Sequence, residues 1–507
     1  MLPRQLITAI LLLCVLAFAF FAYSIGSYML LAIGVLLPPL LMFSARVDLI
    51  AFWVVALYLS TLTLPGMPID LQMYQLMMVF FVIAAMAQRI VVKWPYPTPP
   101  GRGWVLLLIV FLAVLIRIRG LGLRVMGGSL VGGAAYVHLF LAIGFYLLSG
   151  GLTLTAKQWK RAMVTMIALI AVPVILNLTV VLSGGKFWYP LLFIRITFAL
   201  VDTFRAMQQD ATAARWSIFN PLVVIYLMPA LLFPFVKKNY KYYALFFVVA
   251  ACSAMISGVR QLLLQALLFM TAFLLLSSRR RFMTLMVFGL CGLVGLGILV
   301  VLVEHLPYGV QRVMTMVPGV RVSAAAEMAA AETLEWRLML WKLAMADLPK
   351  YLLIGRGFAY NLADSISAVQ HQYMTMDAVR SALMQGDLHM GPMAVIYSLG
   401  TPVLFVFIGL VVTAMVWHVR RHKAEWFDAD LRRYHFVWLV QLSTNLALYS
   451  IAGAARNILP AVLFQLAILH GLAISDSRLA PVKEEPPRRL VQPRRNAEPA
   501  AGGPPGS

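Results

Sequence analysis

The sequence predicts an all-α, polytopic integral membrane protein with about 12 to 14 transmembrane helices and one large helical loop outside the membrane. Of its 507 residues, 62% are hydrophobic, only 12% are charged, and the mean hydropathy is +0.87. A soluble domain carries about 25% charged residues, so this composition excludes a water-soluble globular fold. Long apolar runs separated by short charged or turn-forming clusters supply the second observation.

Each apolar run approaches the roughly 20 residues that a helix needs to cross the hydrocarbon core. The first run leads directly into a second one, so we interpret it as a retained span rather than a signal peptide. The runs lie at residues 6–24, 27–45, 49–64, 71–88, 104–118, 130–149, 162–182, 216–236, 242–257, 261–277, 283–303, 392–417, 434–451 and 457–475.

The spacing of these runs suggests five parts of the chain. The parts are N-terminal transmembrane helices at 1–182, central helices at 183–303, the large loop at 304–391, C-terminal transmembrane helices at 392–475 and a cytoplasmic tail at 476–507. The tail is rich in Pro, Gly, Ala and Arg, and we expect it to be disordered because it has too few apolar residues to bury a core.

The distribution of positive charge predicts which loops face the cytoplasm. If the N-terminus is inside and the loops alternate, 25 of the 41 Lys and Arg residues fall in inside loops, against 8 of the 19 acidic residues. Cytoplasmic loops of membrane proteins carry this excess of cations. The same pattern explains the net charge of +22 without nucleic acid, which we therefore exclude as a partner. Membrane lipids are the expected surroundings.

The loop at 304–391 is then on the outer side, and its sequence predicts an amphipathic helix. Residues 332–347 place Leu334, Leu338, Trp341 and Met345 at helical spacing, which is typical of a helix at a membrane surface. Gly355 and Gly357 predict a tight turn beyond that helix.

Two arginines of the outer side stand next to spans rather than in polar loops. Arg260 lies between two apolar runs with no acidic residue nearby in sequence, and Ser257-Gly258 can interrupt the helix just before it. A charge at such a position is costly and usually marks a functional cavity. Arg215 directly precedes the span at 216–236 and is expected on the same side. Guanidinium groups suit phosphate oxygens, so both predict a phosphorylated anionic ligand.

A histidine supplies the candidate catalytic group. His389 closes the large loop where the chain re-enters the membrane, and a histidine can accept a proton from a hydroxyl group as a general base. No spacing of His, Asp, Glu or the three cysteines is typical of a metal site, and no nucleotide-binding motif is present. We therefore expect no metal and no cofactor.

Taken in order, these motifs resemble the O-antigen ligase and O-antigen polymerase superfamily of bacterial envelope glycan enzymes. The resemblance covers roughly residues 205–415, and the chain departs from the family pattern at Val259 and Met390. The motifs are Arg215 with Asn220-Pro221, Ser257-Gly258 with Arg260, Arg279 to Arg281, Arg337 with Trp341, Ile354-Gly-Arg-Gly357, His389, and Tyr397-Ser-Leu-Gly400.

The resemblance implies a glycosyl transfer at the periplasmic face of the bacterial inner membrane, with residues 304–391 as a periplasmic loop. The implied donor is a glycan linked to undecaprenyl pyrophosphate. The acceptor would be a lipid A core sugar for a ligase, or another lipid-linked repeat for a polymerase. Arg215 and Arg260 would bind the pyrophosphate with help from Arg337 and Arg356, and His389 would act as the base.

Two other functions fit a protein with many spans. A secondary transporter for an anion or small solute would use acidic residues at mid-membrane for ion coupling, and this chain has almost none in its spans. A non-catalytic envelope assembly protein would tolerate the loss of Arg260 and His389. Mutation of these two residues therefore separates an assembly protein from an enzyme.

Overall fold

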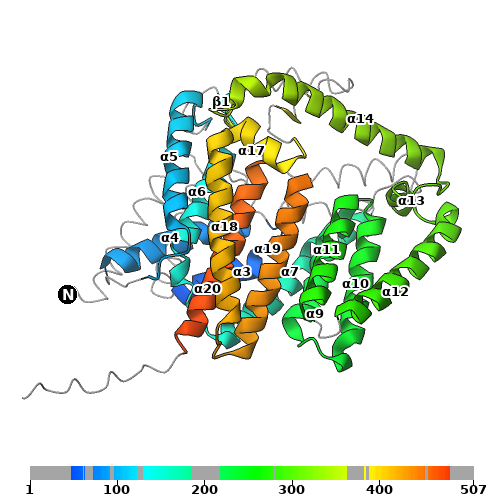
Figure 1. Ribbon diagram of the computed structural model, residues 1–507, viewed down its shortest axis with the longest axis horizontal. Coiled ribbons are helices and arrows are strands. Elements are labelled where there is room, and N and C mark those ends of the chain that lie inside the picture. The colour runs from blue at the N-terminus through cyan, green and yellow to red at the C-terminus, as the bar shows by residue number, and fades with distance from the viewer. Residues whose placement is uncertain are drawn as a thin grey trace, which may run out of the picture.

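The computed structural model describes residues 47–60, 62, 72–91, 96–122, 130–183, 217–277, 281–361, 379, 382–383, 388–451 and 455–479. Within these residues the chain is helical, apart from one antiparallel pair of two-residue strands, in which β1 (Leu130–Val131) pairs with β2 (Tyr360–Asn361). The all-α prediction is therefore confirmed for the described part of the chain. Figure 1 shows most of its long helices running side by side.

The described α-helices follow the predicted apolar runs closely. They are α3 (Val47–Leu57), α4 (Met73–Val91), α5 (Arg102–Arg119), α6 (Ala134–Leu147), α7 (Ala156–Leu182), α9 (Leu227–Leu232), α10 (Tyr240–Ile256), α11 (Arg260–Ser277), α12 (Arg281–Leu302), α13 (Tyr308–Met314), α14 (Ala324–Asp347), α17 (Gly391–Leu399), α18 (Thr401–Lys423), α19 (Ala429–Ile451) and α20 (Ala455–Ser477). Short 3₁₀ helices are η2 (Ser149–Gly151), η5 (Ser217–Tyr226), η6 (Lys237–Asn239), η7 (Val303–His305) and η8 (Leu348–Tyr351).

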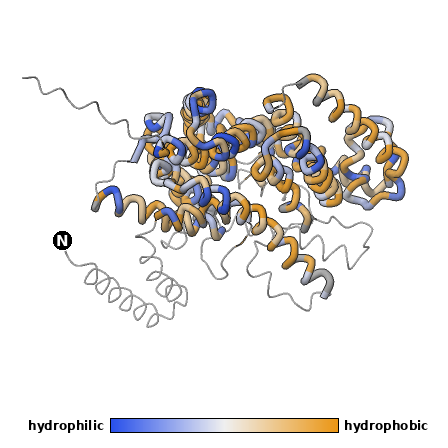
Figure 2. The backbone as a smooth tube through the Cα atoms, turned by 90° about the horizontal axis from the view of Figure 1, so that it is seen from below, coloured by the Kyte–Doolittle hydropathy of each residue, from blue (hydrophilic) through white to orange (hydrophobic). Residues whose placement is uncertain are grey.

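Among the described residues, 6 helices are long and apolar enough to cross a membrane, which is consistent with a multi-pass membrane protein. Shorter apolar helices occupy four further stretches, and Figure 2 shows hydrophobic residues along most of the described chain. The predicted runs 6–24 and 27–45 lie outside the described residues, so the total of 12 to 14 spans stays a prediction. The six spans are Met73–Ile90, Ala156–Leu176, Arg260–Ser277, Met286–His305, Thr401–Lys423 and Asn457–Ser477.

The hydrophobic core surrounds α20. Its Phe464 stacks on Tyr58 with 3.8 Å between ring centroids, and Trp438 of α19 is fully buried beside them. Helix α12 is the opposite case, because almost all of its side chains are exposed. In a membrane protein such an apolar, exposed helix is suited to lipid contact.

Two predicted spans differ from the structure in their geometry. The run at 392–417 is divided at Gly400, where φ is +93°, into α17 and α18. The run at 216–236 forms η5 followed by the short α9. Apolar composition alone predicted continuous helices in both places, since it carries no information about where a helix must turn to pack against its neighbours.

Segments that the charge pattern assigns to the same side lie at the same end of the bundle. At one end, Ser475 Oγ near the end of α20 donates a hydrogen bond to the Leu152 carbonyl before α7. At the other end, Arg119 of α5 donates through Nε to the Gly355 carbonyl after α14. A chain that crosses repeatedly between two surfaces produces this arrangement.

Helix α14 lies across the second end (Figure 1). The amphipathic helix predicted at 332–347 is confirmed as a helix and begins eight residues earlier, at Ala324, where Ser323 Oγ accepts a hydrogen bond from the Ala326 amide. Leu334 and Leu338 are exposed, whereas Leu340 is buried against the bundle. The helix therefore has one face on the protein and an apolar face turned away from it.

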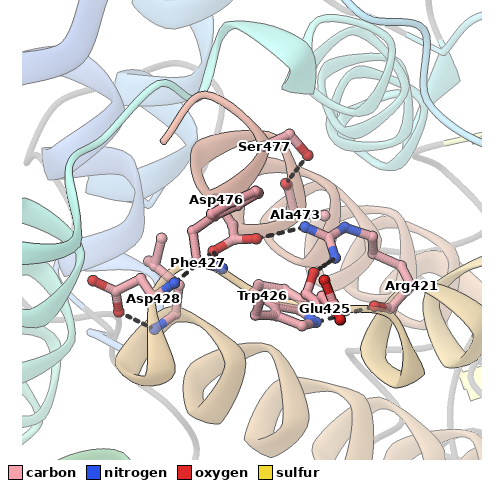
Figure 3. A network of polar contacts seen from close by, with 9 residues as sticks. Arg421, Glu425, Trp426, Phe427, Asp428, Ala473, Asp476 and Ser477 are labelled. Atoms are coloured by element: carbon pink, nitrogen blue, oxygen red, sulfur yellow. Dashed lines mark hydrogen bonds and ion pairs between the residues drawn. The ribbon is translucent and has the colours of Figure 1, made fainter. Parts of the chain in front are cut away.

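A buried carboxylate fixes the turn between α18 and α19 at the opposite end (Figure 3). Asp476 of α20 is fully buried, and its Oδ2 lies 2.6 Å from Arg421 Nη2. Its Oδ1 accepts hydrogen bonds from the backbone amides of Phe427 and Asp428 at 3.0 and 2.9 Å. One side chain thus pairs with a partly buried cation and satisfies two turn amides.

We predict that Asp476→Ala lowers the free energy of unfolding by about 3–5 kcal/mol, because Arg421 loses its carboxylate partner and two turn amides lose their acceptor. Thermal unfolding of the purified protein in detergent measures the change. Asp430→Ala is the control, because Asp430 is about half exposed in its ion pair with Arg433 and should cost at most about 1 kcal/mol. Equal losses in the two variants would contradict this account of Asp476.

Candidate functional site

The candidate site lies at the end of the bundle covered by α14, where two helical hydrogen-bond ladders are interrupted. The first interruption separates α10 from α11 at Ser257-Gly258, and the second separates α17 from α18 at Gly400. Backbone groups released by such breaks need partners, particularly near lipid. Arg260 begins the helix that follows the first interruption, and the backbone amide of Arg356 supplies a partner at the second.

The first interruption confirms the prediction made from Ser257-Gly258. Ser257 Oγ donates to the Ala254 carbonyl at 2.8 Å, which ends α10, and Gly258 then adopts a φ of +69° that other residues rarely adopt. Helix α11 begins two residues later at Arg260. Arg260 therefore lies at the mouth of the α10–α11 hairpin, as expected.

Arg260 is held by α13. Its Nη2 donates to the Arg312 carbonyl at 3.1 Å and to Thr315 Oγ1 at 2.7 Å. Carbonyls at a helix C-terminus lack partners within the helix, so the guanidinium group satisfies one of them. The sequence offers no acidic residue near Arg260, and the structure shows that α13, distant in sequence, and the adjoining Thr315 supply two uncharged hydrogen-bond acceptors.

Arg312 is a residue that the sequence reasoning did not select. It is only 5% exposed, and its Nη2 donates to Thr333 Oγ1 of α14 at 2.7 Å. Its neighbours Val310, Val313 and Met314 are also buried. This run of apolar residues around a single arginine was the available signal that the helix is enclosed.

His389 occupies a constrained position between the large loop and α17. Its φ is +50°, the only positive value for a described residue other than glycine. The preceding Leu388 is buried, and its carbonyl accepts a hydrogen bond from Trp341 Nε1 at 2.9 Å. The His389 ring lies edge-on to Trp336, with 5.4 Å between ring centroids. Such backbone conformations concentrate at functional sites.

Helix α14 connects the arginine cluster with the histidine. Thr333 contacts Arg312, and Trp336 contacts His389. These two residues of α14 are three positions apart, which corresponds to about 4.5 Å along the helix axis. Arg337 follows Trp336 on the same turn and is partly exposed. Arg260, Arg337 and His389 are therefore linked to one turn of α14.

Arg356 is placed elsewhere. Its backbone amide donates to the Tyr397 carbonyl at 2.8 Å, near the end of α17, whereas His389 precedes the start of this helix. The nine residues of α17 correspond to about 13 Å, so the backbone of Arg356 is separated from His389 by that length. Its neighbour Gly355 packs so closely on Ser398 that a Cβ atom would lie 2.4 Å from backbone atoms. The predicted tight turn is confirmed, but it forms a separate part of the surface.

Arg215 and the outer segment 183–215, apart from Ser183, lie outside the described residues. Among the residues that the structure does describe, no acidic side chain forms an ion pair with Arg312 or Arg337. A search of the same residues finds no group of three or more His, Cys, Asp or Glu residues that could hold a metal ion. The described groups thus offer guanidinium donors for an anion and an imidazole for proton transfer.

Comparison with known proteins does not assign the chain to a family. No protein-family model matches it, and a search of curated proteins finds no match.

Proposed function

We propose that the protein transfers or polymerises a glycan from an undecaprenyl-pyrophosphate donor, in the manner of an O-antigen ligase or polymerase. The active site would face the periplasm, and the protein would lie in the bacterial inner membrane. The acceptor would be a lipid A core sugar or a lipid-linked repeat. The observation that carries the proposal is the link, through one turn of α14, between the Arg260–Arg312 cluster and His389.

The reaction requires stabilisation of the leaving pyrophosphate and activation of the acceptor hydroxyl. The arginines would meet the first requirement and His389 the second. When the bond between the sugar and the pyrophosphate breaks, negative charge develops on the leaving pyrophosphate. Arg260, and from the family resemblance Arg215 and Arg337, would stabilise this charge through charge-assisted hydrogen bonds. Arg356 lies beyond α17 and would contribute at most to binding of the extended glycan.

His389 would supply the base. Its imidazole would take the proton of the attacking acceptor hydroxyl, so that a neutral hydroxyl becomes a stronger nucleophile as the new glycosidic bond forms. The contacts that fix Leu388 and the Trp336 ring restrict where the imidazole lies. Charge stabilisation by arginine removes the need for a metal ion in this scheme.

The proposed location predicts a defined labelling pattern. In a variant without the three natural cysteines, we expect Cys at Ala331 of α14 to react with an impermeant maleimide in spheroplasts, and Cys at Ala424 to react only after lysis. Both alanines are exposed and lie at opposite ends of the bundle, so they are matched reporters. The reverse pattern would contradict the periplasmic site.

We predict that Arg260→Ala abolishes surface glycan transfer in a strain that lacks the native chain, although the variant still reaches the membrane. Arg260→Lys should also be poor, because an ammonium group cannot replace a two-pronged contact with pyrophosphate. Arg321→Ala, which removes an exposed arginine of the same side, should transfer normally. Glycan gels and membrane immunoblots provide the measurement, and normal glycan from Arg260→Ala would refute the assignment.

The strain that lacks the native chain also distinguishes a ligase from a polymerase. Accumulation of unattached, lipid-linked chains would indicate a ligase, and accumulation of single repeats would indicate a polymerase. Unchanged surface glycans would favour a transporter instead.

The assignment of His389 predicts both a mutational effect and a pH profile. His389→Ala should lower turnover by roughly 10²- to 10⁴-fold while donor binding survives. His389→Asn is the structural control, since asparagine tolerates a positive φ but lacks the basic nitrogen, and it should be equally slow. Because the base must be neutral to accept a proton, the rate should rise with pH through one ionisation in the histidine range.

Purified protein assayed with EDTA tests the metal-independent scheme, and we expect unchanged turnover. Loss of activity that Mg²⁺ restores would show that arginine is not the main charge stabiliser. Full activity in His389→Asn would move the base elsewhere, with His371 or Asp387 as the next candidates.

A further inference from the structure

Arg312 has an unused donor in a buried position. Its Nη2 is hydrogen-bonded to Thr333, but within the described part of the chain its Nη1 is buried and has no hydrogen-bond partner. A buried guanidinium nitrogen without an acceptor costs free energy, so a native structure that retains one usually has a use for it. No step proposed above uses Arg312.

We propose that Arg260 and Arg312 form a binding site for a phosphate-class anion in which Arg312 Nη1 is a direct ligand. The proposal rests on the proposed function when the anion is identified as the donor pyrophosphate. It adds a residue that neither the sequence motifs nor the family resemblance selected.

The two guanidinium groups are positioned by the same device. Thr315 Oγ1 donates its proton to the Arg312 carbonyl at 2.9 Å, and Thr333 Oγ1 donates its proton to the Ala329 carbonyl at 2.8 Å. Because each hydroxyl proton is already used in a hydrogen bond, Thr315 Oγ1 and Thr333 Oγ1 can act only as acceptors toward the arginines. Arg260 donates to Thr315 and Arg312 donates to Thr333, which fixes one prong of each guanidinium group.

This arrangement brings two cationic side chains together, and the geometry leaves a donor of Arg312 without a partner. The Arg260 guanidinium lies against the backbone of Arg312, so two cations belong to one small region. The acceptors described for them are uncharged hydroxyl and carbonyl oxygens, and no described acid pairs with Arg312. Guanidinium groups that are pre-oriented and partly desolvated bind phosphate oxygens strongly, because the hydrogen bonds are charge-assisted.

The position of the pair suits a ligand anchored in lipid. Arg260 begins α11, a candidate membrane span, and Gly309 at the start of α13 packs on the Ile256 carbonyl at the end of α10. The anion site is therefore at the end of two apolar helices, where the headgroup of a lipid would lie. The donor pyrophosphate and a phospholipid phosphate share this chemistry, and the experiment must separate them.

The test measures binding rather than transfer. The purified full chain, in nanodiscs of phosphatidylcholine, is titrated with inorganic pyrophosphate by calorimetry. We expect Arg312→Gln to weaken binding roughly 10- to 100-fold, as expected for loss of a charge-assisted hydrogen bond. The matched control is Arg321→Gln, which removes the same charge from an exposed position nine residues later and should change affinity by about twofold or less.

A second substitution covers the case in which Arg312→Gln does not fold. Arg312→Lys keeps the charge but loses the forked geometry, and we expect it to bind pyrophosphate roughly tenfold more weakly than wild type. Thermal unfolding without ligand shows which variants are folded. The proposal is overturned if folded Arg312 variants bind pyrophosphate as tightly as Arg321→Gln.

A parallel titration in nanodiscs that contain phosphatidylglycerol identifies the natural source of the anion. If this lipid competes with pyrophosphate in wild type but not in Arg312→Gln, the anion site stands and its occupant is a phospholipid headgroup, which counts against the proposed donor. If competition is absent, the site prefers pyrophosphate. Binding that depends on Arg312 in a protein without glycan transfer would likewise retain the site and reject the proposed function.

Discussion

The structure depends on one constraint: a helix next to lipid must satisfy its own backbone hydrogen bonds, so any interruption has to be covered by protein. Both interruptions at the α14 end of the bundle meet this condition. At Gly400, the carbonyls of Tyr397 and Ser398 accept hydrogen bonds from the amides of Arg356 and Gly357, each at 2.8 Å. At the α10–α11 break, Gly309 of α13 packs on the Ile256 carbonyl, and Arg260 holds α13 there through the Arg312 carbonyl. The covering segments thus bring the polar side chains with them.

Helix α14 connects the arginine cluster at the first interruption with His389 before α17. One face contacts α13 through Thr333 and the residues before α17 through Trp336, and Trp341 at its edge donates to the Leu388 carbonyl. Its opposite face exposes Leu334 and Leu338. A helix with this division can rest on a lipid surface and still hold the polar groups beneath it in fixed positions. The same segment would then provide membrane contact and site geometry.

The two ends of the bundle use arginine in different ways. At one end Arg421 is neutralised by the buried carboxylate of Asp476, and the pair stabilises a turn. At the α14 end Arg312 is held by the Thr333 hydroxyl, which orients its guanidinium group without cancelling the charge, and Thr315 and a carbonyl oxygen orient Arg260 beside it. A paired arginine has little capacity left for a ligand, whereas an oriented one with its charge intact is suited to an anion. This contrast is why the proposed function belongs to the α14 end.

The sequence by itself determined the helical class, most helix positions, the break at Ser257-Gly258 and the turn at Gly355, since these follow from hydropathy and local backbone preference. Only the tertiary structure decided which side chains meet. Arg312 and Thr333 are 21 residues apart, and His389 follows Trp336 by more than 50, so no local pattern relates them. The break at Gly400 could be found only in the structure, because residues 352–357, distant in sequence, form the hydrogen bonds and close contacts at this position. Helix formation is local, but the placement of one polar group beside another depends on how distant helices cover each other.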